Sequence, residues 1–130
     1  MRKRIAVAVL AGTLSLACTV PAFADQWRKD DHGWWYQLND GSYPQSSWKQ
    51  INGKWYYFES DGYMKTGWMQ DGGSWYYLGS DGGMYTGWSL IDNDWYYFDG
   101  NGRMARNTWI NGYWVDDDGE WQPDYEPDAM

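Results

Sequence analysis

Tryptophan is the residue whose number and spacing stand out in this chain of 130 residues, which contains 12 of them. A first series is spaced by 21, 20, 20 and 21 residues and consists of Trp27, Trp48, Trp68, Trp88 and Trp109. A second series follows the first four by seven residues and consists of Trp34, Trp55, Trp75 and Trp95. Indole rings enclose organic cations through cation–π attraction, and they also stack on sugar rings. The paired series predicts a non-covalent binding surface that repeats along the chain.

The residue types that carry catalysis are scarce. His32 is the only histidine, and the only cysteine, Cys18, lies in a segment that we expect to be removed. Hydrolase triads and zinc sites need more such groups than this. The densest acidic run, residues 116–120, lacks the ligand spacing of a calcium loop, so we expect a turn there and not a metal site. We expect no enzyme, no catalytic residues, no cofactor and no metal.

Residues 1–24 have the form of a secretory signal peptide. Three basic residues at 2–4 precede an apolar run at 5–17, and Ala22-Phe23-Ala24 provides a small-x-small cleavage site. The run is too short to span a bilayer, which disfavours the alternative of a membrane anchor. A lipoprotein signal ending at Cys18 is the other alternative. We expect cleavage before Asp25 and a secreted chain with no membrane association afterwards.

The charge limits the partners of the secreted chain. The formal charge is −8, and loss of the three basic residues of the leader makes it −11. Nucleic acid and anionic membranes would repel such a chain, whereas cationic ligands would be tolerated or attracted. We therefore expect no nucleic-acid partner.

The elements that position the tryptophans are predicted to be β-hairpins. Aromatic residues favour strands, and only seven Leu, Ile and Val residues remain after the leader, so the core must be largely aromatic. Asn52-Gly53, Asp71-Gly72 and Asn111-Gly112 are predicted hairpin turns. The turns predicted to lead into the next unit are Asp61-Gly62, Asp81-Gly82 and Asn101-Gly102. We expect an all-β solenoid of about five stacked hairpins over residues 25–121, followed by a disordered acidic tail at 122–130.

Alternation along each strand sorts the aromatic runs into two faces. In the run from Trp55 to Phe58, Trp55 and Tyr57 share one face, and Tyr56 and Phe58 share the other. We expect the second face to be core in every unit. The predicted core residues are Tyr56, Phe58, Tyr76, Leu78, Tyr96 and Phe98.

The repeat W-x6-W-Y-Y-[FL]-x2-D-G-x-M-x-T-G-W, over about residues 27–121, resembles the choline-binding or cell-wall-binding repeat of Gram-positive surface proteins. The resemblance implies a hairpin solenoid with choline held between consecutive hairpins. Two Trp of one repeat, one aromatic residue of the next and a nearby Met would form each cage. Related repeats of glucan-binding proteins and toxins share the hairpin and bind sugars, so a glycan remains the alternative ligand.

Carried over to this chain, the resemblance implies several choline sites. The first complete site comprises Trp48, Trp55, Tyr77 and Met84. The second comprises Trp68, Trp75, Tyr97 and Met104. Trp88 and Trp95 begin a third site, with Trp114 as the candidate to close it. A further site at the N-terminal end would comprise Trp27, Trp34, Tyr57 and Met64. Tyr77 and Tyr97 are the expected closing residues because they share a strand face with Trp75 and Trp95.

The function implied is attachment of a secreted module to choline-substituted teichoic acids at the surface of a Gram-positive bacterium. Recognition of glucan or another glycan by the same aromatic surfaces is the alternative. The cage composition and the charge of −11 favour choline. The sequence leaves the oligomeric state and any catalytic partner open.

Overall fold

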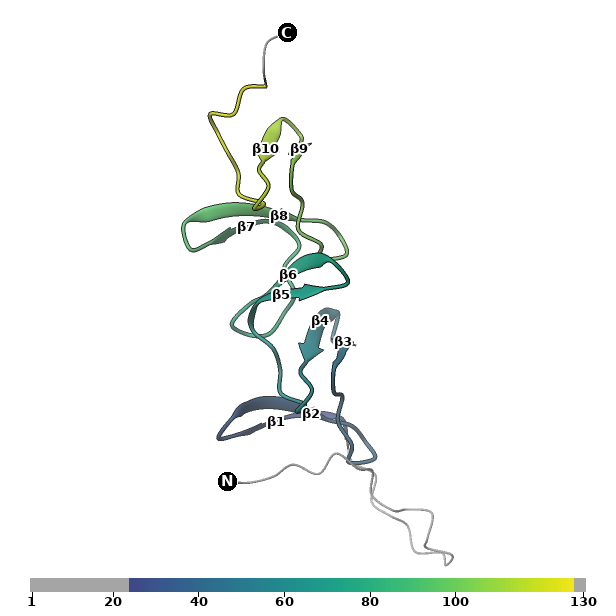
Figure 1. The fold of residues 1–130 in the computed structure, drawn as a ribbon. Helices are drawn as coiled ribbons and strands as arrows, with labels where there is room; N and C mark the ends of the chain where they lie inside the picture. Colours follow the sequence, from purple (N-terminus) through teal and green to yellow (C-terminus); the bar gives the residue numbers. More distant parts are fainter. Residues whose placement is uncertain (1–23, 128–130) are drawn as a thin grey trace, which may run out of the picture. The chain divides into compact units, whose positions relative to one another are not determined.

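The computed structural model describes residues 24–127, and within them the protein is all β (Figure 1). Ten strands pair as five separate two-stranded antiparallel sheets. The expected all-β class and hairpin repeats are therefore confirmed. The predicted signal peptide lies, apart from its last residue, outside the described residues. Across residues 24–127, no helix has the length and hydropathy needed to cross a bilayer.

The chain divides after Lys65 into two compact units. The first unit holds two hairpins, β1 (Gln26–Asp30) with β2 (Gly33–Gln37) and β3 (Ser47–Ile51) with β4 (Lys54–Phe58). The second unit holds three hairpins: β5 (Gly67–Asp71) with β6 (Ser74–Leu78), β7 (Gly87–Ile91) with β8 (Asp94–Phe98), and β9 (Thr108–Ile110) with β10 (Tyr113–Val115). The last hairpin is the shortest, as its truncated sequence implies.

Four of the five hairpin turns lie at residue pairs with positive φ, and the exception is the turn at residues 31–32 between β1 and β2. Asn52-Gly53 and Asn111-Gly112 occupy such turns, as predicted. The prediction of Asp71-Gly72 is wrong by one residue, because Asp71 ends β5 opposite Ser74 and Gly72-Gly73 form the turn. A two-residue turn of this kind needs positive φ at both positions, which glycine adopts without steric cost.

A second turn after each of the last four hairpins brings the following segment back beside the strand that has just ended. The Gly102 N–H donates to the Asp99 carbonyl at 2.9 Å, and this turn returns the chain so that Met104 pairs with Phe98. The same isolated pairing joins Phe58 to Met64, Leu78 to Met84 and Val115 to Trp121. Trp121 therefore stands where the three preceding repeats have methionine.

The final residue of the second strand is the most buried position of each of the last four hairpins. Phe58, Leu78, Phe98 and Val115 are fully buried. This confirms the prediction of core positions for Phe58, Leu78 and Phe98. Because a single fully buried side chain anchors each of these hairpins, contacts between neighbouring hairpins must supply much of the remaining burial.

Candidate functional site

Two indole rings stand at right angles on one face of the hairpin β5–β6. The ring centroids of Trp68 and Trp75 are 6.3 Å apart, with an interplanar angle of 82°. Tyr77 lies opposite Trp68 in the strand register and packs on it at 5.1 Å. Trp75 is still 36% exposed. The hairpin thus presents two perpendicular aromatic walls with a solvent-accessible side.

The next hairpin, β7–β8, closes these walls with Tyr96. The Tyr96 ring lies 4.8 Å from Trp68, and the core residue Phe98 lies 5.9 Å from it. The Met104 N–H donates to the Trp75 carbonyl at 2.9 Å. This bond holds the segment that follows β8 against the hairpin β5–β6. Trp68, Trp75, Tyr96 and Met104 line a cavity of about 450 Å³, together with Arg106, Asp117 and Asp118.

The expectation that Tyr97 closes this site is not met by the geometry. Tyr97 instead packs on Trp88, its cross-strand partner, at 5.3 Å. The hairpin β7–β8 turns one face, with Tyr96, toward β5–β6 and the other, with Trp88, toward β9–β10. The pocket between β5–β6 and β7–β8 is therefore formed by opposite strand faces of the two hairpins. The residue that closes it lies on the same face of β8 as Tyr96, and Trp95 lies on the other face. For the same reason Tyr96, expected to be core, lines a pocket.

A second cavity in this unit, of about 280 Å³, lies between β7–β8 and the last hairpin. All four residues that line it are aromatic: Trp88, Trp95, Tyr113 and Trp121. Tyr113 lies 5.8 Å from Trp88, and the Trp121 N–H donates to the Trp95 carbonyl at 2.8 Å. Trp88 and Trp95 are therefore brought together as predicted. The sequence reasoning missed both residues that close the cavity.

Trp114, the residue expected to close that third site, lies elsewhere. It packs on its cross-strand partner Trp109 at 5.3 Å. Aligning the buried Val115 with Phe98 would have revealed this, because Trp114 then corresponds to Tyr97 and Tyr113 to Tyr96.

The C-terminal tail covers the face on which Trp114 and Trp109 lie. The Tyr125 ring stacks on Trp114 at 4.5 Å and 15°, and it lies 5.7 Å from Trp109. Tyr125 thus lies against Trp109 as Tyr113 of the following hairpin lies against Trp88. The described residues end at 127, so the predicted disorder of the whole segment 122–130 stays a prediction.

The first unit repeats the same arrangement. Trp27 lies 6.4 Å from Trp34 at 87°, and Tyr56 of the next hairpin packs on Trp27 at 4.9 Å. The Met64 N–H donates to the Trp34 carbonyl at 2.8 Å. Here too the residue beside Trp27 is Tyr56 and not the expected Tyr57. The Lys29 ammonium lies 5.7 Å from the centroid of the Trp34 ring, so this ring already attracts a cation of the chain itself.

The predicted site of Trp48, Trp55, Tyr77 and Met84 takes its residues from both units. In the first unit, Trp48 packs on its cross-strand partner Tyr57 at 5.3 Å. In the second unit, Met84 lies against Gly102, whose missing side chain leaves room for the Met84 thioether. This site stays a prediction.

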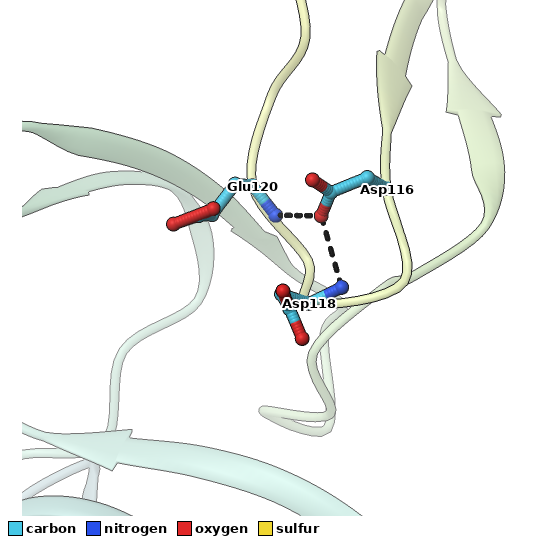
Figure 2. A group of neighbouring side chains, drawn as sticks. All are labelled: Asp116, Asp118 and Glu120. Atoms are coloured by element: carbon cyan, nitrogen blue, oxygen red, sulfur yellow. Dashed lines mark hydrogen bonds between the residues drawn. The ribbon is translucent and has the colours of Figure 1, made fainter.

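The acidic run near the C-terminus forms a turn (Figure 2). The Asp116 Oδ1 accepts hydrogen bonds from the N–H groups of Asp118 and Glu120, both at 2.9 Å. The Gln122 Nε2 donates to Asp116 Oδ2 at 2.8 Å. The carboxylates of Asp116, Asp118 and Glu120 lie close enough to hold a metal ion, but those hydrogen bonds already assign a structural role to Asp116. Asp99 accepts equivalent bonds in the preceding repeat.

Two pKa shifts arise where this turn meets the first cavity. Burial, followed by the charges of Asp94 and Asp116, raises the pKa of the Glu120 carboxyl. Burial, followed by the charge of Glu120, raises the pKa of Tyr96 to about 12. The Tyr96 phenol is therefore neutral at physiological pH, and its ring offers an uncharged π face to the cavity.

The repeats place the chain in a known class of modules. The family model for the choline-binding repeat matches residues 45–84 and 65–109. The chain belongs to this family, and the described region is a choline-binding-repeat module.

Solved structures of related proteins share the fold. Choline binding protein F from Streptococcus pneumoniae is 41% identical, with a TM-score of 0.71 over 76% of this chain and 34% of that one. The choline binding domain of Spr1274 from the same species is 50% identical, with a TM-score of 0.58 over 61% of this chain and 96% of the domain. The endolysin of phage Cp-1, solved with choline, is 34% identical, with a TM-score of 0.63 over 85% of this chain and 41% of that one. The chain thus spans about a third of choline binding protein F.

Proposed function

We propose that this chain is a secreted module that binds choline on the teichoic acids of a Gram-positive cell wall. The observation that carries the proposal is the arrangement of Trp68, Trp75 and Tyr96 around one cavity. The signal-peptide sequence supports secretion, and the similarity to a pneumococcal cell wall endolysin supports a place at the cell wall. In this proposal the hairpins stack as a solenoid, and the second unit carries one pocket at each of its two junctions between hairpins.

The chemistry of the pocket suits a trimethylammonium group. Such a group donates no hydrogen bonds from nitrogen, so water solvates it weakly, while aromatic faces offer it a negative quadrupole and an apolar wall together. A cation over one ring gains roughly 0.5–1 kcal/mol when exposed and about 2 kcal/mol or more when desolvated. After the entropic cost of binding, three rings give an affinity on the order of millimolar to high micromolar.

Repetition compensates for this weak affinity. A polymer that carries many cholines engages several pockets at once, and the second and later contacts are then intramolecular. We propose the two cavities of the second unit as binding pockets, with Trp88 and Trp95 forming part of the second. Trp27 with Trp34, and Trp48 with Trp55, are proposed as part of further pockets.

Glycan recognition is the second candidate function. The observation that favours it is the presence of Arg106, Asp117 and Asp118 at the larger cavity, because sugar sites place polar groups beside an aromatic wall. Titration of the protein with choline and with a soluble glucan, followed by Trp fluorescence, separates the two functions. Choline is expected to change the emission and to elute the protein from a quaternary-amine resin, whereas salt alone elutes it poorly. A change with glucan and none with choline would reverse the assignment.

A further inference from the structure

The two cavities of the second unit differ in the charge of their rims. Four aromatic residues line the smaller one. The larger one has three exposed ionic side chains beside its aromatic walls: Arg106, Asp117 and Asp118. Both cavities combine the two tryptophans of one hairpin with a tyrosine from the next hairpin. Any difference in ligand preference between the two cavities must therefore come from these ionic side chains, or from the presence of Met104 in one cavity and Trp121 in the other.

Arg106 is held at the rim by the backbone on both sides. The Ala105 N–H donates to the Tyr97 carbonyl at 2.8 Å, and the Asn107 N–H donates to the Asp116 carbonyl at 3.0 Å. These bonds fix the start of the Arg106 side chain next to Met104. For a ligand whose ammonium is bound between Trp68 and Trp75, the Arg106 guanidinium is the positively charged lining group that a negatively charged substituent of the ligand can contact.

We propose that Arg106 determines ligand specificity at this one pocket by binding a phosphate group attached to the choline. The inference rests on the proposed function. In phosphocholine, two carbon atoms separate the ammonium from the phosphate ester, so an ammonium in the cage leaves the phosphate at the rim. A guanidinium binds phosphate by paired, charge-assisted hydrogen bonds. The pocket lined by Trp88, Trp95, Tyr113 and Trp121 lacks such a group among its lining residues and is expected to accept choline and phosphocholine without this preference.

Asp117 and Asp118 carry the opposite charge to Arg106, so their removal should have the opposite effect on the preference between phosphocholine and choline. Both carboxylates lie on the same rim, and Asp117 accepts a hydrogen bond from the Asn107 side chain at 2.9 Å. Their negative charge favours the ammonium and repels a phosphate. Loss of Arg106 and loss of an Asp charge should therefore move the preference for phosphocholine over choline in opposite directions.

The test measures each pocket separately. The indole N–H resonances of Trp75 and Trp95 are followed in ¹H–¹⁵N spectra while choline or phosphocholine is added. Arg106→Gln is expected to weaken phosphocholine binding at Trp75 about threefold, as for an exposed ion pair, and to leave choline binding unchanged or slightly stronger. Asp118→Asn should raise the preference for phosphocholine over choline there. The affinities read at Trp95 should not change, and high salt should remove the effect at Trp75.

Arg103→Gln is the matched control, because Arg103 is an exposed arginine three residues earlier that does not line the cavity. An equal effect of Arg103→Gln would mean that only the overall charge matters, and the inference would be wrong. It would also be wrong if Arg106→Gln changed the affinities for both ligands by the same factor. If neither ligand moved any indole resonance of the unmodified protein, the proposed function would fail together with the inference.

Discussion

Replacing Tyr96 by leucine should weaken choline binding at the larger cavity, whereas the same change at Tyr97 should not. The two tyrosines are neighbours on β8 and face opposite ways. Tyr96 packs on Trp68 at 4.8 Å and lines the cavity, and Tyr97 packs on Trp88 at 5.3 Å. Leucine keeps most of the apolar contact but removes the π face.

The size of the effect follows from the loss of one of three ring faces. A cation–π contact contributes roughly 0.5–2 kcal/mol, depending on how far the cation is desolvated. Since about 1.4 kcal/mol is a factor of ten, Tyr96→Leu should weaken choline binding between about 2-fold and 30-fold. Each variant also loses one aromatic pair of roughly 0.5–1.5 kcal/mol, so the two should have similar thermal stabilities.

The assay is a choline titration followed at the Trp75 indole resonance, with thermal unfolding of both variants as the control for folding. Tyr97→Leu serves as the matched control for Tyr96→Leu. If Tyr97→Leu weakened binding at Trp75 more than Tyr96→Leu did, the argument from opposite strand faces would be refuted.

Three further predictions concern stability. Gly102→Ala should lower the melting temperature, because Gly102 has a φ of 84° and Met84 occupies the space that a Cβ would need; calorimetry of the variant measures the loss, expected to be at least 1–2 kcal/mol. Glu120→Gln should stabilise the protein at pH 7. The raised pKa of the Glu120 carboxyl means that its stability contribution is complete below the unfolded pKa and is lost as pH rises through the folded one, so the difference in melting temperature should vanish in acid. Tyr125→Ala removes the ring stacked on Trp114 and should speed amide hydrogen exchange in β9–β10 while leaving exchange in β5–β6 unchanged. If exchange in β9–β10 were no faster in the variant than in the unmodified protein, the role of the tail as a cover would be contradicted.

The repeat made the hairpins predictable, because aromatic strands and turn pairs recur at a fixed spacing. Which residue closes a pocket was not predictable from alternation within one strand. Alternation places Tyr97 with Trp95 on one face, but it does not say which face of the next hairpin is opposite. That depends on how successive hairpins meet, which only the structure supplies.

The last repeat was hard to interpret for a different reason. Its shortened strands hid the correspondence of Trp121 with Met104, which becomes visible only through the pairing of Val115 with Trp121. The role of Gly102 was likewise hidden, because the space beside it is filled by Met84 from the preceding repeat. The sequence shows that a glycine occupies the turn, but not that a distant thioether requires one there.

At the position shared by Met64, Met104 and Trp121, the backbone joins successive repeats, whereas the side chain affects which ligand is bound. At each of them, the backbone N–H donates to a carbonyl of the preceding hairpin, and that bond does not depend on the side chain. The side chains of Met104 and Trp121, in contrast, each form part of the wall of a cavity. Duplicated copies of a repeat can therefore diverge in selectivity by a single codon without disturbing how the copies join, so one chain can come to carry pockets with different ligands.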